Sequence, residues 1–136
     1  MAILTNSINN PVVGLQLKYD DVKVNSGAGY NKNHGNFVAP VNGSYFFSFT
    51  ASVKPDGGSL RIYMKKSDGS IVGHLLFLGN TFYVKESENI VIHLNKGEEV
   101  WTEIGMTSGT IHIHGTEEGP VSTYIHTHFS GFRIGD

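Results

Sequence analysis

The chain has 136 residues, and its 10 basic and 12 acidic side chains give a formal net charge of -2 at pH 7. This length predicts one domain over residues 1–136, and the near balance of charge argues against a nucleic-acid-binding surface. The absence of cysteine excludes disulfides, a thiol nucleophile and thiolate metal ligands. Residues 1–10 carry neither a basic leader nor a long apolar run, so we expect no membrane insertion, and a leader already removed if the protein is secreted.

Apolar and polar side chains alternate with a period of two along several segments, which is typical of strands with one buried face. The first segment is expected to turn four residues towards the core: Tyr45, Phe47, Phe49 and Ala51. Two later segments repeat the pattern, with core faces formed by Leu60, Ile62 and Met64 and by Ile90, Ile92 and Leu94. Helical periodicity is hard to find, so the sequence predicts an all-β fold.

Turn sequences rich in glycine, aspartate and asparagine separate these segments, at residues 55–58, 67–70, 95–97 and 108–109. The closing segment, Val121 to Ile134, breaks the alternation because Phe129 and Phe132 would lie on opposite faces of a regular strand. It therefore predicts either a β-bulge at Ser130 and Gly131 or a strand buried on both faces.

Four sequence pieces resemble the complement C1q globular-head family. They comprise residues 17–22, LKYDDV; Asn25, Tyr30, Gly35, Asn36, Phe37, Pro40 and Gly43 with residues 45–49, YFFSF; residues 94–101, LNKGEEVW; and residues 129–132, FSGF. The resemblance implies a ten-stranded jelly-roll sandwich of two antiparallel sheets, shared with the tumour necrosis factor family. It also implies a homotrimer that binds ligands outside cells and has no catalytic centre.

Two residues depart from the family pattern, since Ala39 replaces a frequent cysteine and Asn42 a frequent proline. Residues 1–136 contain no collagen-like Gly-X-Y repeat, so we expect the chain to be similar to the stalkless C1q proteins of invertebrates. That similarity implies a secreted recognition protein of innate immunity that binds microbial glycans or lipopolysaccharide as a lectin. Two alternatives stay open: a cytokine-like or scaffolding trimer that binds a protein receptor, and a histidine-based metal-binding protein of the extracellular matrix.

A sugar-binding surface needs an aromatic ring for the apolar face of the sugar and polar groups for its hydroxyls. Six residues are our candidates for it: Arg61, Tyr63, Trp101, Glu103, His112 and His114. Arg61 and Tyr63 alternate with core residues of one expected strand, and Trp101 with Glu103 does so on another. No nucleophile elbow, phosphate loop or zinc-protease motif is present, so we expect no enzymatic activity.

Four of the seven histidines occur in two His-x-His pairs, at residues 112–114 and 126–128. In a strand, this spacing places both rings on one face about 6.5 Å apart, where they can chelate a metal such as Zn²⁺. We take His126 and His128 as the candidate metal ligands, although outward polar residues would show the same pattern. The resemblance matches Gly79 to Asn89 to a loop in which family members often bind calcium, but this segment offers only Glu86 and Glu88, so calcium is not indicated and no cofactor is expected to be required.

Overall fold

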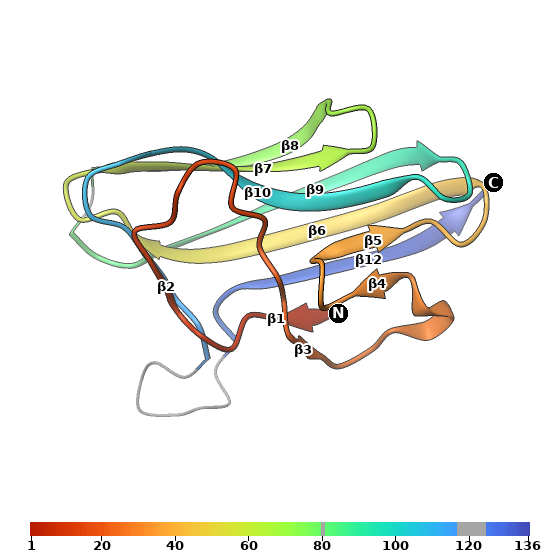
Figure 1. Ribbon diagram of the computed structural model, residues 1–136, viewed down its shortest axis with the longest axis horizontal. Helices are drawn as coiled ribbons and strands as arrows, with labels where there is room; N and C mark the ends of the chain where they lie inside the picture. Colours follow the sequence, from red (N-terminus) through yellow and green to blue (C-terminus); the bar gives the residue numbers. More distant parts are fainter. Residues whose placement is uncertain (80, 117–124) are drawn as a thin grey trace.

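The structure is a computed structural model, and it describes residues 1–79, 81–116 and 125–136. These residues form two antiparallel sheets that pack face to face, with a single 3-10 helix, η1 (Ser26–Ala28), and no α-helix (Figure 1). The seven-stranded sheet contains β1 (Ala2–Ile3), β2 (Ile8–Asn9), β3 (Asp21–Val22), β6 (Gly43–Lys54), β9 (Val84–Leu94), β11 (His112–Ile113) and β12 (His128–Gly135). The five-stranded sheet contains β4 (Tyr30–Asn31), β5 (Asn36–Val38), β7 (Ser59–Lys66), β8 (Ile71–Leu78) and β10 (Glu99–Ser108).

The predicted all-β jelly-roll sandwich is confirmed. The described residues form twelve strands where ten were expected, because β1, β2, β3, β4 and β11 are short pairings of two residues each. No helix in these parts of the chain has the length and hydropathy needed to cross a membrane.

The central strand of the seven-stranded sheet is β6. One of its edges pairs with β9 over the whole span from Gly43 to Val53. Its other edge pairs first with β12 and then, at Val53 and Lys54, with β11. Figure 1 shows β6, β9, β10 and β12 running along the longest axis of the molecule. The last strand of the chain is therefore an interior strand, with β6 on one side and β1 on the other.

The core lies between the two sheets and follows the alternation in the sequence. Its members include the four predicted residues of β6, each no more than 1% exposed, and Leu60, Ile62 and Met64 of β7, each 0% exposed. In β9 only Leu94 is fully buried, while Ile90 and Ile92 pack partly against the core. One buried polar contact crosses the core, between the Tyr19 hydroxyl and Thr102 Oγ1 at 2.8 Å.

The closing strand differs from both sequence predictions. Ser130 and Gly131 pair in regular register with β6, so the predicted bulge there is wrong, and the register shift falls between Arg133 and Gly135. A Cβ on Gly131 would lie 2.5 Å from the ring of Phe47, so glycine lets that ring fill the core while β12 stays regular. Phe132 is 54% exposed, so β12 is not buried on both faces in the single chain. The predicted residues Val121 to Tyr124 lie outside the described part.

Candidate binding surfaces

A group of aromatic and charged side chains lies on the outer face of the five-stranded sheet. We call it the Trp101 patch and define it as Arg61, Tyr63 and Lys65 of β7 with Trp101 and Glu103 of β10. The two strands are neighbours, and their register places Trp101 opposite Lys65 and Glu103 opposite Tyr63. All five are half-buried and alternate with core residues. The structure thus brings together four of the six candidate sugar-binding residues.

Glu103 organises the Trp101 patch. One of its carboxylate oxygens accepts a hydrogen bond of 2.8 Å from the indole Nε1 of Trp101. The other oxygen lies 3.4 Å from the ammonium nitrogen of Lys65. Gly105 leaves room for the neighbouring ring, since a Cβ there would lie 2.1 Å from the ring of Tyr63. These contacts hold the two rings and the charged groups in place before any ligand arrives.

The border of the Trp101 patch comes from a segment far away in the sequence. Leu17 N donates to Thr102 O at 2.9 Å, and Ile104 N donates to Leu15 O at 2.9 Å, so residues 14–17 run beside β10. Gln16 forms an isolated bridge with Glu103. On the other side, His74 of β8 pairs with Tyr63. Neither Gln16 nor His74 was among the residues predicted from the sequence, because only the sheet pairing brings them to the patch.

His112 and His114 do not join the Trp101 patch. They lie in and just after β11, which pairs with β2 and β6 of the seven-stranded sheet. His112 contacts Asn9 through its Nδ1 atom. The six candidate residues therefore belong to two different sheets.

The two His-x-His pairs meet through one histidine from each. The rings of His114 and His126 stack with centroids 3.7 Å apart and an interplanar angle of 13°. The ring of Tyr83 stacks on His114, with centroids 4.2 Å apart. We call these three residues the His114 stack. The backbone around it is tied by Thr127, whose hydroxyl donates to His114 O and accepts from Ser52 N.

The neighbouring His128 is half-buried in β12. Burial, followed by the positive charges of Lys85 and the N-terminus, lowers the pKa of His128 from its usual value. Its Nδ1 atom is buried and has no hydrogen-bond partner among the described residues. This histidine therefore favours the neutral form, which is the form that can bind a metal.

No group of three or more His, Asp or Glu side chains suited to a metal ion occurs within residues 1–79, 81–116 and 125–136. The His114 stack offers two imidazoles, so the remaining ligands of a tetrahedral site would come from solvent or from another copy of the chain. Glu86 and Glu88, the two acidic residues of the segment matched to the family's calcium loop, lie within strand β9 and pair with Ala51 and Phe49 of β6. The regular hydrogen bonding of the strand prevents a loop that wraps around an ion.

The outer face of the seven-stranded sheet carries exposed apolar side chains. Phe46 of β6 pairs with Val91 of β9 and with Phe132 of β12, and we call these three residues the Phe46 patch. The rings of Phe46 and Phe132 are 5.2 Å apart. Val91 is 59% exposed and Phe132 is 54% exposed. Contiguous exposed apolar side chains of this kind mark a surface for association.

Comparison with known proteins identifies the family to which this chain is similar. The family model described as C1q domain matches residues 1–134. The heavy metal-binding protein HIP of Mytilus edulis is 32% identical over 98% of this chain and 58% of its own length. A complement C1q subcomponent of Mus musculus is 31% identical over 92% of this chain and 49% of its own length. The chain thus spans about half the length of these curated relatives.

A solved structure shares the fold over almost its whole length. The globular domain of the zebrafish complement 1qA protein superposes with a TM-score of 0.64 and covers 94% of each chain at 20% identity. The match of the family model to nearly every residue and the sandwich seen here agree with one another, and the chain belongs to the C1q domain family.

Proposed function

We propose that this protein is an extracellular recognition domain that binds microbial surface glycans or lipopolysaccharide as a homotrimer. The observation that carries the proposal is the Trp101 patch, in which an indole and a phenol ring lie beside fixed charged groups. Aromatic faces stack on the apolar faces of sugars, and carboxylate, ammonium and guanidinium groups bind sugar hydroxyls and phosphates. C1q-domain proteins are generally recognition or structural proteins without enzymatic activity, and the family of this chain supports the same role here.

Self-assembly is the second part of the proposal. C1q-domain proteins are typically trimeric, and the exposed Phe46 patch offers an apolar surface that another copy of the chain can cover. Three equivalent Trp101 patches would then bind a repetitive surface together. Linked sites gain avidity over a single site by factors of about 10²–10⁴ when the geometry allows simultaneous contact. A shallow half-buried surface can thus support strong binding to a microbial coat.

The experiment is a glycan and lipopolysaccharide array probed with the purified protein, with and without chelator, alongside its mass in solution. Trp101→Ala should abolish the signal, because it removes the stacking ring and the indole donor to Glu103. Phe82→Ala is the matched control, since Phe82 is an aromatic residue that is 74% exposed outside the patch. Chelator-insensitive binding by a trimer, lost only in Trp101→Ala, supports the proposal. A trimer that binds no glycan but binds a cell-surface protein would replace it with the receptor-binding alternative.

Metal binding is the second candidate function, and the His114 stack favours it. One histidine from each His-x-His pair contributes to this stack, and a similar protein of Mytilus edulis is named as heavy metal-binding. Calorimetry with Zn²⁺ and Cu²⁺ tests it. His126→Ala should remove binding, whereas His112→Ala should retain it because His112 contacts Asn9 instead of the stack. Equal affinity in both variants would contradict a site at the stack.

A further inference from the structure

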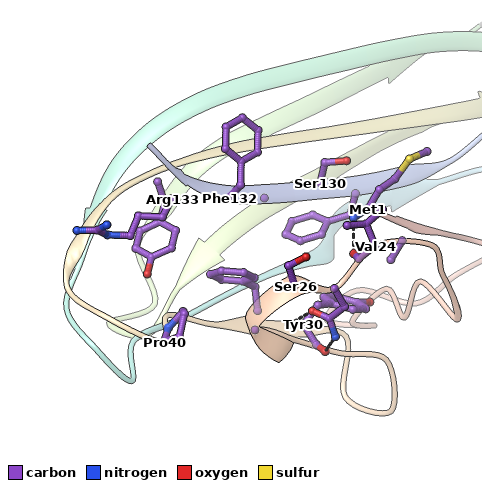
Figure 2. A pocket seen from close by; sticks show the side chains of 15 residues that line it. Met1, Val24, Ser26, Tyr30, Pro40, Ser130, Phe132 and Arg133 are labelled. Carbon is purple, nitrogen blue, oxygen red and sulfur yellow. Dashed lines mark hydrogen bonds between the residues drawn. The ribbon is translucent and has the colours of Figure 1, made fainter. Parts of the chain in front are cut away.

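A cavity of about 490 Å³ opens between the two sheets, beside β12, β4 and η1. Figure 2 shows its lining side chains between the strand that carries Ser130 and Phe132 and the segment that carries Ser26 and Tyr30. Most of the lining is apolar or aromatic, and its members include Ala2, Val24, Tyr30, Phe37, Tyr45 and Phe129. The volume falls in the range of small-molecule sites, and the lining favours an apolar ligand.

The aromatic walls of this cavity are held in place by the protein. The rings of Tyr30 and Phe129 are 5.7 Å apart, and those of Phe37 and Tyr45 are 5.6 Å apart. The Tyr30 hydroxyl accepts a hydrogen bond from Tyr19 N at 2.9 Å. The Tyr45 hydroxyl donates to the Val41 carbonyl at 2.7 Å. Both phenol groups are therefore already hydrogen-bonded, and a preformed apolar wall loses little conformational entropy on binding.

Arg133 is the only charged side chain among the described residues that line the cavity. It lies at one end of the cavity, with Met1 at the other (Figure 2). Its Nε donates to the Asn42 carbonyl at 3.2 Å, which fixes the guanidinium. Its terminal nitrogen pairs with the Asp136 carboxylate, a fully exposed group. Because an exposed ion pair contributes little stability, a ligand carboxylate can replace Asp136 on Arg133.

We propose that this cavity binds a small amphipathic carboxylate. The hydrocarbon part lies against the wall formed by the Tyr30 and Phe129 rings, and the carboxylate pairs with Arg133. This site is separate from the Trp101 patch and from the His114 stack, so the proposal does not depend on glycan or metal binding. Binding of such a carboxylate in the cavity makes the domain a carrier or sensor of fatty-acid-like molecules.

Calorimetric titration with octanoate, decanoate and octanol tests the chemistry of the site. Decanoate should bind about sixteenfold more tightly than octanoate, because each of its two additional methylenes strengthens binding by about fourfold when buried. Arg133→Gln should weaken octanoate binding by about tenfold and leave octanol binding unchanged. Equal losses for octanoate and octanol would overturn the role of Arg133 as the carboxylate partner.

A second variant tests the location. Ser26 is an exposed residue of η1 that lines the cavity, so the bulky side chain in Ser26→Trp should fill the cavity and weaken decanoate binding by at least about tenfold. Thr110→Trp is the control, because Thr110 is exposed and does not line the cavity. Proton NMR of the unmodified protein should show Overhauser contacts between decanoate methylenes and the Tyr30 and Phe129 rings. This measurement locates the bound decanoate even if Ser26→Trp does not fold. Absence of those contacts, or equal affinity in Ser26→Trp and the unmodified protein, would overturn the proposal.

Discussion

Gly105 determines where the Tyr63 ring lies in the Trp101 patch. A Cβ at this position would come within 2.1 Å of the ring, well inside van der Waals contact. The ring thus occupies the space that any other residue at position 105 would need. The lack of a side chain at Gly105 on β10 therefore sets the shape of the Trp101 patch, which β10 forms with β7.

The first prediction concerns this contact. Gly105→Ala should lower the free energy of unfolding by about 1–3 kcal/mol, because the ring or the strand must shift to relieve the overlap. Urea denaturation measures the loss. In the double variant Gly105→Ala with Tyr63→Ala, the alanine methyl meets no ring, so its added cost should almost vanish. An additive double variant would show that the ring does not occupy this space.

His128 makes the free energy of unfolding depend on pH. Burial lowers its pKa in the folded state below the usual histidine value of about 6.5. Below that pH the unfolded chain takes up a proton on His128 before the folded chain does, so unfolding binds protons. The stability contributed by this neutral histidine is therefore present above about pH 6.5 and declines as the pH falls towards its lowered folded-state pKa.

The second prediction tests the direction of this pH dependence. The free energy of unfolding should fall less in His128→Gln than in the unmodified protein between about pH 7.5 and about pH 5, which bracket the usual histidine pKa. Urea denaturation at both pH values gives the two differences. His34→Gln is the control, since His34 is exposed in the turn before β5. A steeper loss in His128→Gln would reverse the assigned direction of the pKa shift.

At the scale of elements, β8 shows how alternation decides the cost of losing a side chain. Gly73, Leu75 and Phe77 turn inward, and Leu75 is 4% exposed. Leu78 at the end of the same strand is 65% exposed. The two leucines have the same chemistry and belong to the same strand, so only their face differs.

The third prediction uses this pair. Leu75→Ala should lower the free energy of unfolding by about 2–5 kcal/mol, because it removes buried methyl groups and leaves a cavity. Leu78→Ala should change it by no more than about 0.5 kcal/mol. Urea or thermal unfolding of the two variants measures the difference. Comparable losses would mean that Leu78 is also covered, for example by another copy of the chain.

At the scale of the whole molecule, the two sheets differ in what their outer faces carry. The five-stranded sheet carries the charged and aromatic Trp101 patch, whereas the seven-stranded sheet carries the apolar Phe46 patch. An apolar surface gains free energy when a partner covers it, while a polar surface can remain in water. This asymmetry favours assembly through one face and ligand binding at the other.

The fourth prediction follows from that division. Phe132→Asp should weaken self-association by at least about tenfold, because it buries an unpaired charge in the contact. Ile71→Asp is the matched control, since Ile71 is 52% exposed on the other sheet. Sedimentation velocity should show a trimer for the control and smaller species for Phe132→Asp. A trimer of unchanged stability in both variants would place the contact elsewhere.

Local patterning was enough to predict an all-β fold and most of its core, whereas the jelly-roll sandwich was implied by the family resemblance. Alternation in β6 and β7 assigns each side chain to a face because successive residues of a strand point to opposite sides. The same rule placed Arg61 and Tyr63 on the outside of β7, and Trp101 with Glu103 on the outside of β10. It failed at Ser130 and Gly131, where the opposite faces of Phe129 and Phe132 suggested a bulge although the strand is regular.

Along β6 and β7, the sequence by itself determined which residues are buried and which face outward, since that depends on the period of the strand. Only the tertiary structure decided which outward residues meet, because pairing between distant strands sets their neighbours. It separated His112 and His114 from Trp101 by assigning them to the other sheet. It also stacked His114 on His126 across the fold and opened a cavity at an edge between the sheets, neither of which any local pattern specifies.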